Sequence, residues 1–443
     1  MKLLEGLKKN TTGGTLLRGA GSAFALNIIG LGLGFGLQIL LARLMGVAHY
    51  GAYVYVLSWM SILVLFATFG LDYASLRFIP LYHAKADWAA LSGLLRKSFI
   101  YTFIISTVVG ILTALCVWTY VSRQGGLFYV FLLGALLLPI WSLANLRQAT
   151  LRALKQIAYA RFPDMVVRPL VLALLVGLLW WGTQAQITAT FGMAAHVIAV
   201  FTAFLVSTYF LKKILPTQVS EHEPQEHARL WLTTAAALMF VSGMHIVLNE
   251  IDKIMLGLMI DVDAVGVYSI AARISVLMLF GLQSINTIAA PMISELYASK
   301  SIDEFQKFVS KVAKWIAVVS LPMLLIIIFF GQFILGLFGE AFQIAYVPLL
   351  LLALGQLVNM SVGPVGFLLT MTGNEKVQLR ILIVTLIVNI ALNLPAIYYF
   401  GINGAAFATS FSIALRNIMA WNKSKALLGV DSSIMYLLRK RDI

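Results

Sequence analysis

The chain has 443 residues, of which 60% are hydrophobic and only 11% are charged, and its formal net charge is +14. Soluble proteins carry about 25% charged residues, so this composition excludes an ordinary soluble fold and places most of the chain in a bilayer. The single Cys116 excludes an intramolecular disulfide, and the positive charges lie at the ends of apolar segments, which favours membrane topology over nucleic-acid binding.

Long apolar segments recur along the whole chain, and a membrane helix needs about 20 such residues. The sequence therefore predicts an all-α polytopic membrane protein with about twelve transmembrane helices. The fifth segment is the shortest, and we expect it to extend backwards or to lie in a thin part of the bilayer. In chain order the predicted spans cover residues 19–42, 52–79, 98–120, 126–148, 167–182, 187–210, 230–250, 264–291, 315–335, 345–371, 379–399 and 401–421.

The distribution of Lys and Arg predicts the orientation of these spans, because positive residues collect on the cytoplasmic side. The termini and the loops after even-numbered spans hold 28 of the 32 Lys and Arg residues. The opposite side holds only Arg43, Arg123, Lys253 and Arg273. Both termini are therefore expected in the cytoplasm.

One long polar connection lies in the middle of the chain, at residues 212–229. It contains two prolines and charges of both signs, which is typical of a linker. We therefore expect an N-terminal six-helix bundle over residues 1–211, this cytoplasmic linker, and a C-terminal six-helix bundle with a basic tail over residues 230–443.

An internal repeat supports this division. Residues 51–85 align without gaps on residues 266–300, at a constant offset of 215, so that Gly51 meets Gly266 and Tyr53 meets Tyr268. Such matches at both ends of a span are hard to attribute to hydrophobicity alone. Two six-helix halves must share one orientation, which predicts a pseudo-twofold axis along the membrane normal.

Motifs for covalent chemistry are absent from the sequence. There is no phosphate-binding loop, and the closest histidine pair, His222 and His227, lies in the polar linker. His245 lies within a span, where a packing role is favoured over proton transfer. We therefore expect no enzyme activity, no cofactor and no metal site.

Charged residues inside or at the ends of spans are the main candidates for function, because burying a charge in a membrane is costly. At the offset of 215 these charges are not duplicated: Asp72 faces Thr287, and Arg273 faces Ser58. That asymmetry favours function over scaffold, whereas Arg18, Arg147, Arg152 and Arg416 lie near cytoplasmic ends and are expected to anchor helices. The candidates for a polar interior are Arg43, Asp72, Arg77, Glu250, Asp252, Lys253 and Arg273.

Uncharged polar residues also recur within the spans. Some are expected to join helices by hydrogen bonds, but their number favours a hydrated cavity that binds a hydroxyl-rich ligand. They are Asn27, Gln38, Asn249, Gln283, Asn286, Gln356, Asn359, Asn389 and Asn393.

Three segments resemble the polysaccharide biosynthesis flippases: LLARLMGVAHYGAY at residues 40–53, LRALK at 151–155, and IDKIMLGLMIDVDAVGVYSIAARI at 251–274. The resemblance implies membership of the multidrug, oligosaccharidyl-lipid and polysaccharide exporter superfamily. It also implies a flippase that moves a polyprenyl-diphosphate-linked oligosaccharide across the bacterial inner membrane by alternating access. Lipid II flippases are similar but have two additional spans, and multidrug extruders share the twelve-span plan.

By this resemblance, the substrate diphosphate is expected to bind the cationic candidates, since Arg forms bidentate bonds to phosphate. These are Arg273, Arg77, Arg43 and Lys253, whereas Asp72, Glu250 and Asp252 are expected to titrate or bind a coupling ion. The expected partners are the lipid-linked oligosaccharide, membrane lipids and, further, a polysaccharide polymerase and other assembly proteins, with no nucleic acid.

Three alternatives stay open at this point. A cation-coupled multidrug extruder shares the architecture, and a nontransporting scaffold of a glycan-synthesis complex would need no charges within spans. A membrane-embedded polymerase would be expected to carry a large external loop, which the sequence lacks.

Overall fold

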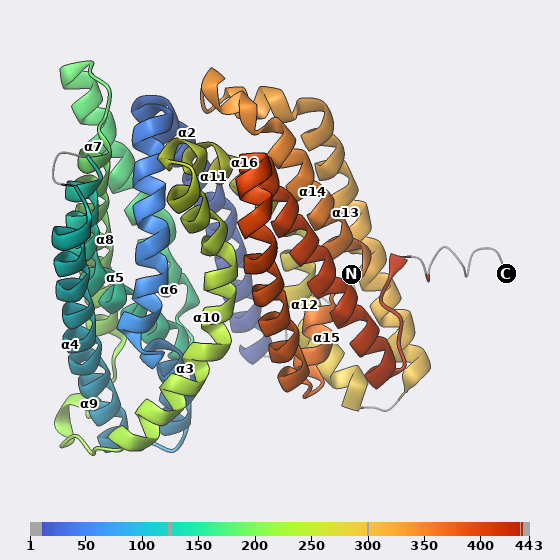
Figure 1. Cartoon of the computed structure of the whole chain (residues 1–443). Coiled ribbons are helices and arrows are strands. Elements are labelled where there is room, and N and C mark those ends of the chain that lie inside the picture. The colour runs from blue at the N-terminus through green and yellow to red at the C-terminus, as the bar shows by residue number, and fades with distance from the viewer. Residues whose placement is uncertain (1–10, 123–125, 299–300, 435, 437–443) are drawn as a thin grey trace. The chain divides into compact units, whose positions relative to one another are not determined.

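A computed structural model describes the main chain of residues 11–122, 126–298, 301–434 and 436. Side chains are described from Leu26 onward, apart from residues 220, 241, 280–281, 284, 286–288 and 290–291. Every regular element among these residues is helical, which confirms the predicted all-α class (Figure 1). The chain divides into two compact units, unit 1 up to Gly243 and unit 2 from Met244.

Unit 1 consists of the helices that precede this boundary. The elements are α2 (Thr11–Thr68), α3 (Leu71–Ala84), α4 (Trp88–Tyr120), α5 (Leu127–Ala153), α6 (Ile157–Phe162), the π-helix η1 (Pro163–Val167), α7 (Arg168–Thr183), α8 (Ala189–Ile214), α9 (Gln218–Glu221) and the first part of α10 (Ala228–Met259). Helix α5 packs most extensively against α4 and α8, and it also packs against α2 and α3.

A glycine breaks α2 where the first two predicted spans meet. Gly46 adopts φ 69°, a left-handed conformation that glycine tolerates best. Near the break, two backbone carbonyls accept hydrogen bonds from the loop between α7 and α8. Gln186 donates from Nε2 to the Met45 carbonyl at 2.7 Å, and the Ile187 N–H donates to the Leu44 carbonyl at 2.9 Å. Membrane helices require such replacement bonds wherever the backbone ladder is interrupted.

The shortest predicted span, 167–182, does extend backwards. Residues Ile157–Thr183 run as a single apolar element through α6, η1 and α7. The π-helical turn begins at Pro163, whose missing N–H removes one bond of the regular ladder.

The predicted linker is packed against unit 1. Gln225 donates its backbone N–H to the Ala89 carbonyl at 3.0 Å, and the ammonium of Lys97 lies 2.5 Å from the carboxylate of Glu226. Just beyond it, the indole of Trp231 is buried and donates to the Tyr82 hydroxyl at 3.0 Å. These residues are part of unit 1, which extends to Gly243.

Unit 2 consists of the rest of α10 and the helices that follow it. They are α11 (Val262–Leu277), α12 (Leu279–Ala298), α13 (Ile302–Gly336), the 3₁₀-helix η2 (Glu340–Ala345), α14 (Tyr346–Ser361), α15 (Val365–Met371) and α16 (Glu375–Leu428). Helix α16 is broken at Gly401, which has φ 56°. Its two arms then pack closely, because a Cβ on Gly404 would lie 1.8 Å from the Ala396 carbonyl oxygen.

After α16 the chain folds back on the same unit. Gln306 in α13 forms two hydrogen bonds of 2.7 Å with the backbone N–H and carbonyl of Asp431. Ser432 donates its hydroxyl to the Val362 carbonyl at 2.6 Å. These bonds fix the segment after α16 to α13 and to the loop between α14 and α15.

The Asp431 carboxylate accepts several hydrogen bonds in the segment that follows α16. Partial burial acts to raise its pKa, but hydrogen bonds from Ser433, Trp421 and Lys425 outweigh it and hold the pKa below the ordinary value of 3.8. The Trp421 indole donates at 2.9 Å, and the Lys425 ammonium lies at 3.0 Å.

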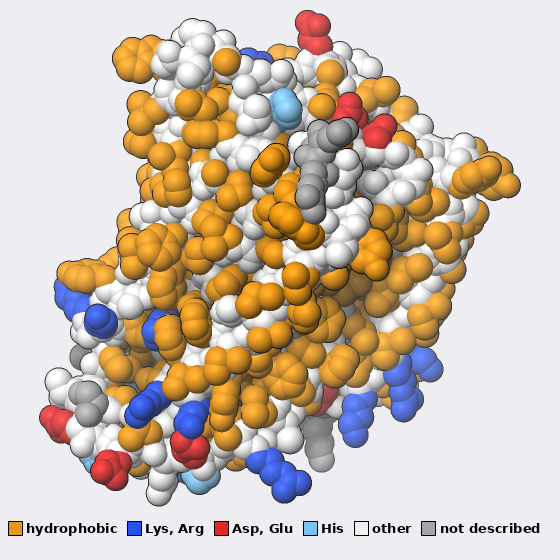
Figure 2. Space-filling view, turned by 60° about the vertical axis from the view of Figure 1, so that its left-hand side comes forward, with side chains coloured by type: hydrophobic (Ala, Val, Ile, Leu, Met, Phe, Trp, Pro, Cys, Tyr) orange, Lys and Arg blue, Asp and Glu red, His pale blue; other side chains and the backbone are white. Residues whose placement is uncertain are grey.

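The outer surfaces of the helices fit a lipid environment. Large apolar side chains on α13, such as Phe329 and Phe333, are 75% and 68% exposed, and Figure 2 shows hydrophobic side chains over much of the face, with Lys and Arg near one end. Eight helices, or nine if a bent pair counts as one span, are long and apolar enough to cross a membrane among the described residues. Two of these helices contain the breaks at Gly46 and Gly401, and the number twelve stays a prediction.

Candidate functional site

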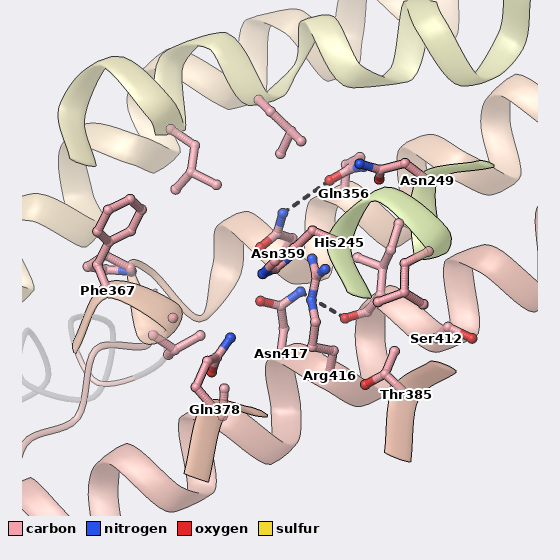
Figure 3. Close-up of a pocket in the computed structure, with 18 of the residues that line it drawn as sticks. His245, Asn249, Gln356, Asn359, Phe367, Gln378, Thr385, Ser412, Arg416 and Asn417 are labelled. Carbon is pink, nitrogen blue, oxygen red and sulfur yellow. Dashed lines mark hydrogen bonds between the residues drawn. The ribbon is translucent and has the colours of Figure 1, made fainter. Parts of the chain in front are cut away.

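A polar cavity of about 390 Å³ lies within unit 2 (Figure 3). We call it the amide cavity, because seven of its described lining residues carry carboxamides, contributed by α10, α12, α14 and α16. Its volume lies in the range of small-molecule sites. The polar lining residues are His245, Asn249, Gln283, Gln356, Asn359, Gln378, Thr385, Asn389, Thr409, Ser412, Arg416 and Asn417.

The polar groups of the amide cavity retain unused hydrogen-bonding capacity. Asn359 donates to the Gln356 Oε1 at 3.1 Å, and Asn417 donates to a carbonyl of its own helix. The buried acceptors Gln378 Oε1 and Asn389 Oδ1 have no hydrogen-bond partner among the described residues.

Arg416 gives the amide cavity its charge. Its guanidinium lies beside His245, on which it acts electrostatically, and beside Asn417 in Figure 3. No ion pair joins Arg416 to a carboxylate within the described part of the chain. The described lining residues include no Asp or Glu, so the cavity presents an uncompensated positive group among neutral amides.

A buried carboxylate lies behind one wall of the amide cavity. Asp252 in α10 is 3% exposed, and it accepts hydrogen bonds from Tyr268 at 2.9 Å, from Asn393 at 2.8 Å and from Thr409. All three donors are neutral. Thr409 also lines the cavity, so the carboxylate and the cavity share a wall residue.

The internal repeat places two buried tyrosines at matching positions with different partners. Tyr53 in unit 1 lies with its hydroxyl 2.5 Å from His196 Nδ1, whereas Tyr268 in unit 2 donates to Asp252. The duplicated fold therefore keeps the tyrosine, and only unit 2 puts a carboxylate beside it.

Three of the predicted cations are exposed. Arg273 in α11 of unit 2 does not line the cavity, and Arg43 in α2 and Arg77 in α3 are residues of unit 1. The ammonium of Lys253 lies 2.5 Å from the carboxylate of Glu250, one helical turn away.

Asp72, at the start of α3, is half-buried. Its Oδ1 has no hydrogen-bond partner within the described part of the chain. No group of three or more His, Cys, Asp or Glu that could hold a metal occurs among the described residues.

The sequence predicted several of the polar residues that line the amide cavity, but not the arginine that gives it its charge. Five of the predicted polar residues line it, and the side chain of a sixth, Asn286, lies outside the described residues; the five are Asn249, Gln283, Gln356, Asn359 and Asn389. Arg416, expected to anchor a helix end, lines the cavity instead, as does His245. Arg416 follows Thr409 and Ser412 at helical spacing, which puts the three polar residues on one helix face, and this spacing is the signal that could have found Arg416.

Comparisons of sequence agree with this architecture. The family model described as "Polysaccharide biosynthesis protein" matches residues 16–297, and the MatE family model matches residues 237–394. The probable flippase AglR of Haloferax volcanii is 29% identical over 51% of this chain and 46% of its own length. An uncharacterized membrane protein of Methanocaldococcus jannaschii is 24% identical over 82% of this chain and 74% of its own length.

The chain thus spans about half the length of AglR. It spans 36% of the length of the probable low-salt glycan biosynthesis flippase Agl15, also of Haloferax volcanii. Two solved structures share the fold at low sequence identity. An inward-facing MATE family multidrug resistance transporter has a TM-score of 0.73 at 14% identity, covering 90% of this chain and 94% of its own. The lipid II flippase MurJ, in an inward closed conformation, has a TM-score of 0.70 at 16% identity, covering 92% and 87%. With a family model matched over more than half of its residues, this multi-pass membrane chain belongs to the polysaccharide biosynthesis protein family.

Proposed function

We propose that the protein is a flippase that moves a lipid-linked oligosaccharide across a membrane by alternating access, without covalent chemistry. The observation that carries the proposal is the amide cavity, a hydrogen-bonding interior inside a bundle with an apolar exterior. Sugar hydroxyls both donate and accept hydrogen bonds, as carboxamides do, so such a lining replaces the water that a glycan loses on entering the membrane.

The remaining parts of the substrate require other surfaces. A polyprenyl tail stays in lipid, and the diphosphate is expected at the exposed cations Arg273, Arg77 and Arg43, with Lys253 close to its partner Glu250. We place the protein in a bacterial plasma membrane with both termini in the cytoplasm, and a polysaccharide polymerase among its assembly partners. The similar flippases named above are archaeal, so the host membrane is part of the proposal.

We assign coupling to Asp252. An ionised carboxylate surrounded by neutral donors is costly to bury, and a bound proton or cation removes that cost. The amide oxygens Asn389 Oδ1 and Asn393 Oδ1 belong to residues of this region, are buried and have no hydrogen-bond partner among the residues whose side chains are described, and hard cations prefer such oxygen ligands. Because Thr409 contacts both Asp252 and the cavity, occupancy of one site changes the other.

A cation-coupled drug extruder is the second candidate, and the MatE match over residues 237–394 favours it. That match covers the first part of unit 2, including His245 and Asn389. The charge of the amide cavity argues against it, because Arg416 would repel the cationic drugs that such extruders carry.

The test uses purified protein in liposomes that contain a defined lipid-linked oligosaccharide. Arg416→Gln is expected to reduce transbilayer movement at least tenfold, since a charge-assisted bond contributes about 1.5–3 kcal/mol. Arg380→Gln is the matched control, because Arg380 is an exposed arginine of the same helix that does not line the cavity.

Equal movement by wild type and Arg416→Gln would remove the amide cavity from the transport path. No movement by wild type, together with efflux of cationic dyes, would favour the extruder. No movement of either class of substrate would favour the nontransporting scaffold.

A further inference from the structure

The charge and the hydrogen-bonding groups of the amide cavity together restrict what can occupy it. Arg416 is the only lining Lys or Arg among the described residues, and His245 beside it can donate a hydrogen bond in either protonation state. The nearest described carboxylate network, at Asp252, forms no ion pair with Arg416. An occupant that places one anionic group at Arg416 compensates this charge.

The carboxamides that line the amide cavity favour an occupant that both donates and accepts hydrogen bonds, because each amide offers an N–H donor and a carbonyl acceptor. Inorganic phosphate in its charged forms offers mainly acceptor oxygens, so it would use only part of this lining. Hydroxyl groups both donate and accept.

The lining of the amide cavity is partly apolar. Its larger apolar side chains include Leu248, Val276, Leu279, Leu282, Phe367 and Ile413. A pyranose ring likewise combines apolar and polar parts, with C–H groups on its faces and hydroxyls around its edge. The cavity therefore fits a sugar ring better than a uniformly polar ion.

The number of cations selects the kind of anion. A diphosphate carries about two negative charges, and Arg416 neutralises one, so a buried diphosphate would keep an uncompensated charge in a low-dielectric site. Arg273, the exposed arginine of unit 2 that is predicted for the diphosphate, does not line the cavity. A carboxylate needs a single guanidinium and pairs with it in bidentate geometry.

We propose that the amide cavity recognises an acidic sugar, with its carboxylate at Arg416 and His245, its hydroxyls on the carboxamides and its C–H groups on the apolar side chains of the lining. This inference rests on the proposed function, because it names the part of the lipid-linked glycan that enters the cavity. The proteins that supply the substrate would then include an enzyme that attaches a uronic acid to the glycan.

The test compares two ligands that differ only at carbon 6, methyl glucuronide and methyl glucoside, by ligand-observed NMR on purified protein in nanodiscs. The glucuronide is expected to bind about tenfold more tightly or better, as a charge-assisted hydrogen bond provides. Pyrophosphate, the second source of anionic charge, is expected not to displace it. Arg416→Gln abolishes the preference, Arg416→Lys keeps part of it, and Arg380→Gln leaves it unchanged.

The proposal is overturned if the two glycosides bind equally, if neither binds, or if pyrophosphate displaces the glucuronide. It is also overturned if Arg416→Gln keeps the preference while its thermal stability matches wild type. Transbilayer movement of a neutral lipid-linked glycan in liposomes is measured in parallel. Movement without a glucuronide preference would refute the acidic-sugar inference and leave the flippase proposal standing.

Discussion

Two substitutions of Asp252 separate its charge from its role in packing. Asp252→Ala removes the acceptor of Tyr268, Asn393 and Thr409. Tyr268 can still donate to Thr409 Oγ1 at 3.3 Å, but the Thr409 hydroxyl and one Asn393 N–H are left without an acceptor. Each unsatisfied buried donor costs about 1–3 kcal/mol, so the substitution is expected to destabilise unit 2 by about 2–6 kcal/mol.

Asp252→Asn is expected to cost much less. The new amide oxygen can accept from Tyr268 and Thr409, and the new amide nitrogen can donate to Asn393 Oδ1, which has no partner among the described residues. Rotating the Asn393 amide makes this possible but gives up its 3.1 Å bond to the Asn389 carbonyl, so the network loses its charge and one neutral bond, at a cost of about 0.5–1.5 kcal/mol.

The assay is thermal unfolding in detergent, combined with transport in liposomes at several Na⁺ concentrations and pH values. We expect Asp252→Asn to unfold near the wild-type temperature while its transport no longer responds to the cation gradient. The reasoning is refuted if Asp252→Asn and Asp252→Ala are equally unstable, or if transport by a stable Asp252→Asn protein still follows the gradient.

Three further predictions concern the frame around the site. Gly46→Ala is expected to lower stability by about 1–2 kcal/mol in thermal unfolding, because its φ is 69°; Gly36→Ala, at an open helical position, is the control and is expected to be neutral or stabilising. Gly93→Ala places a Cβ 1.8 Å from the Gln225 carbonyl, so limited proteolysis should cut residues 212–229 faster than in wild type. The pKa of Asp431 is lower in the folded state than its ordinary value of 3.8, so the ionised carboxylate stabilises the folded protein. This stabilisation is complete at pH values above 3.8 and is lost as the pH falls through the folded-state pKa. The stability difference between wild type and Asp431→Asn should therefore be present at neutral pH and vanish in acid, whereas a difference independent of pH would contradict this.

The helical class and the polar residues of the second half could be predicted from the sequence. Apolar runs and their charged ends follow directly from what a bilayer excludes, and the carboxamides stand out within those runs. Asp252 could be singled out because it lies with Glu250 and Lys253 in a charged cluster at the end of a predicted span. These signals are local, and a single sequence carries them.

The position of Arg416 could not be predicted in this way. A basic residue near a cytoplasmic helix end fits anchoring as well as cavity lining, and the choice depends on which helix face turns inward. That face is set by the break at Gly401, where the second arm of α16 folds back on the first. The packing of the polar linker on α4 depends likewise on a close backbone approach at Gly93, which composition does not reveal.

The central claim is tested most directly by reconstituting this protein alone in liposomes with a lipid-linked oligosaccharide that carries a glucuronic acid. A glycosidase added outside reports how much glycan has become accessible. We expect the wild-type protein to make the inner-leaflet glycan accessible to the glycosidase. We expect Arg416→Gln to do so at least tenfold more slowly and Arg380→Gln to match wild type. Accessibility no greater than in protein-free liposomes would contradict it.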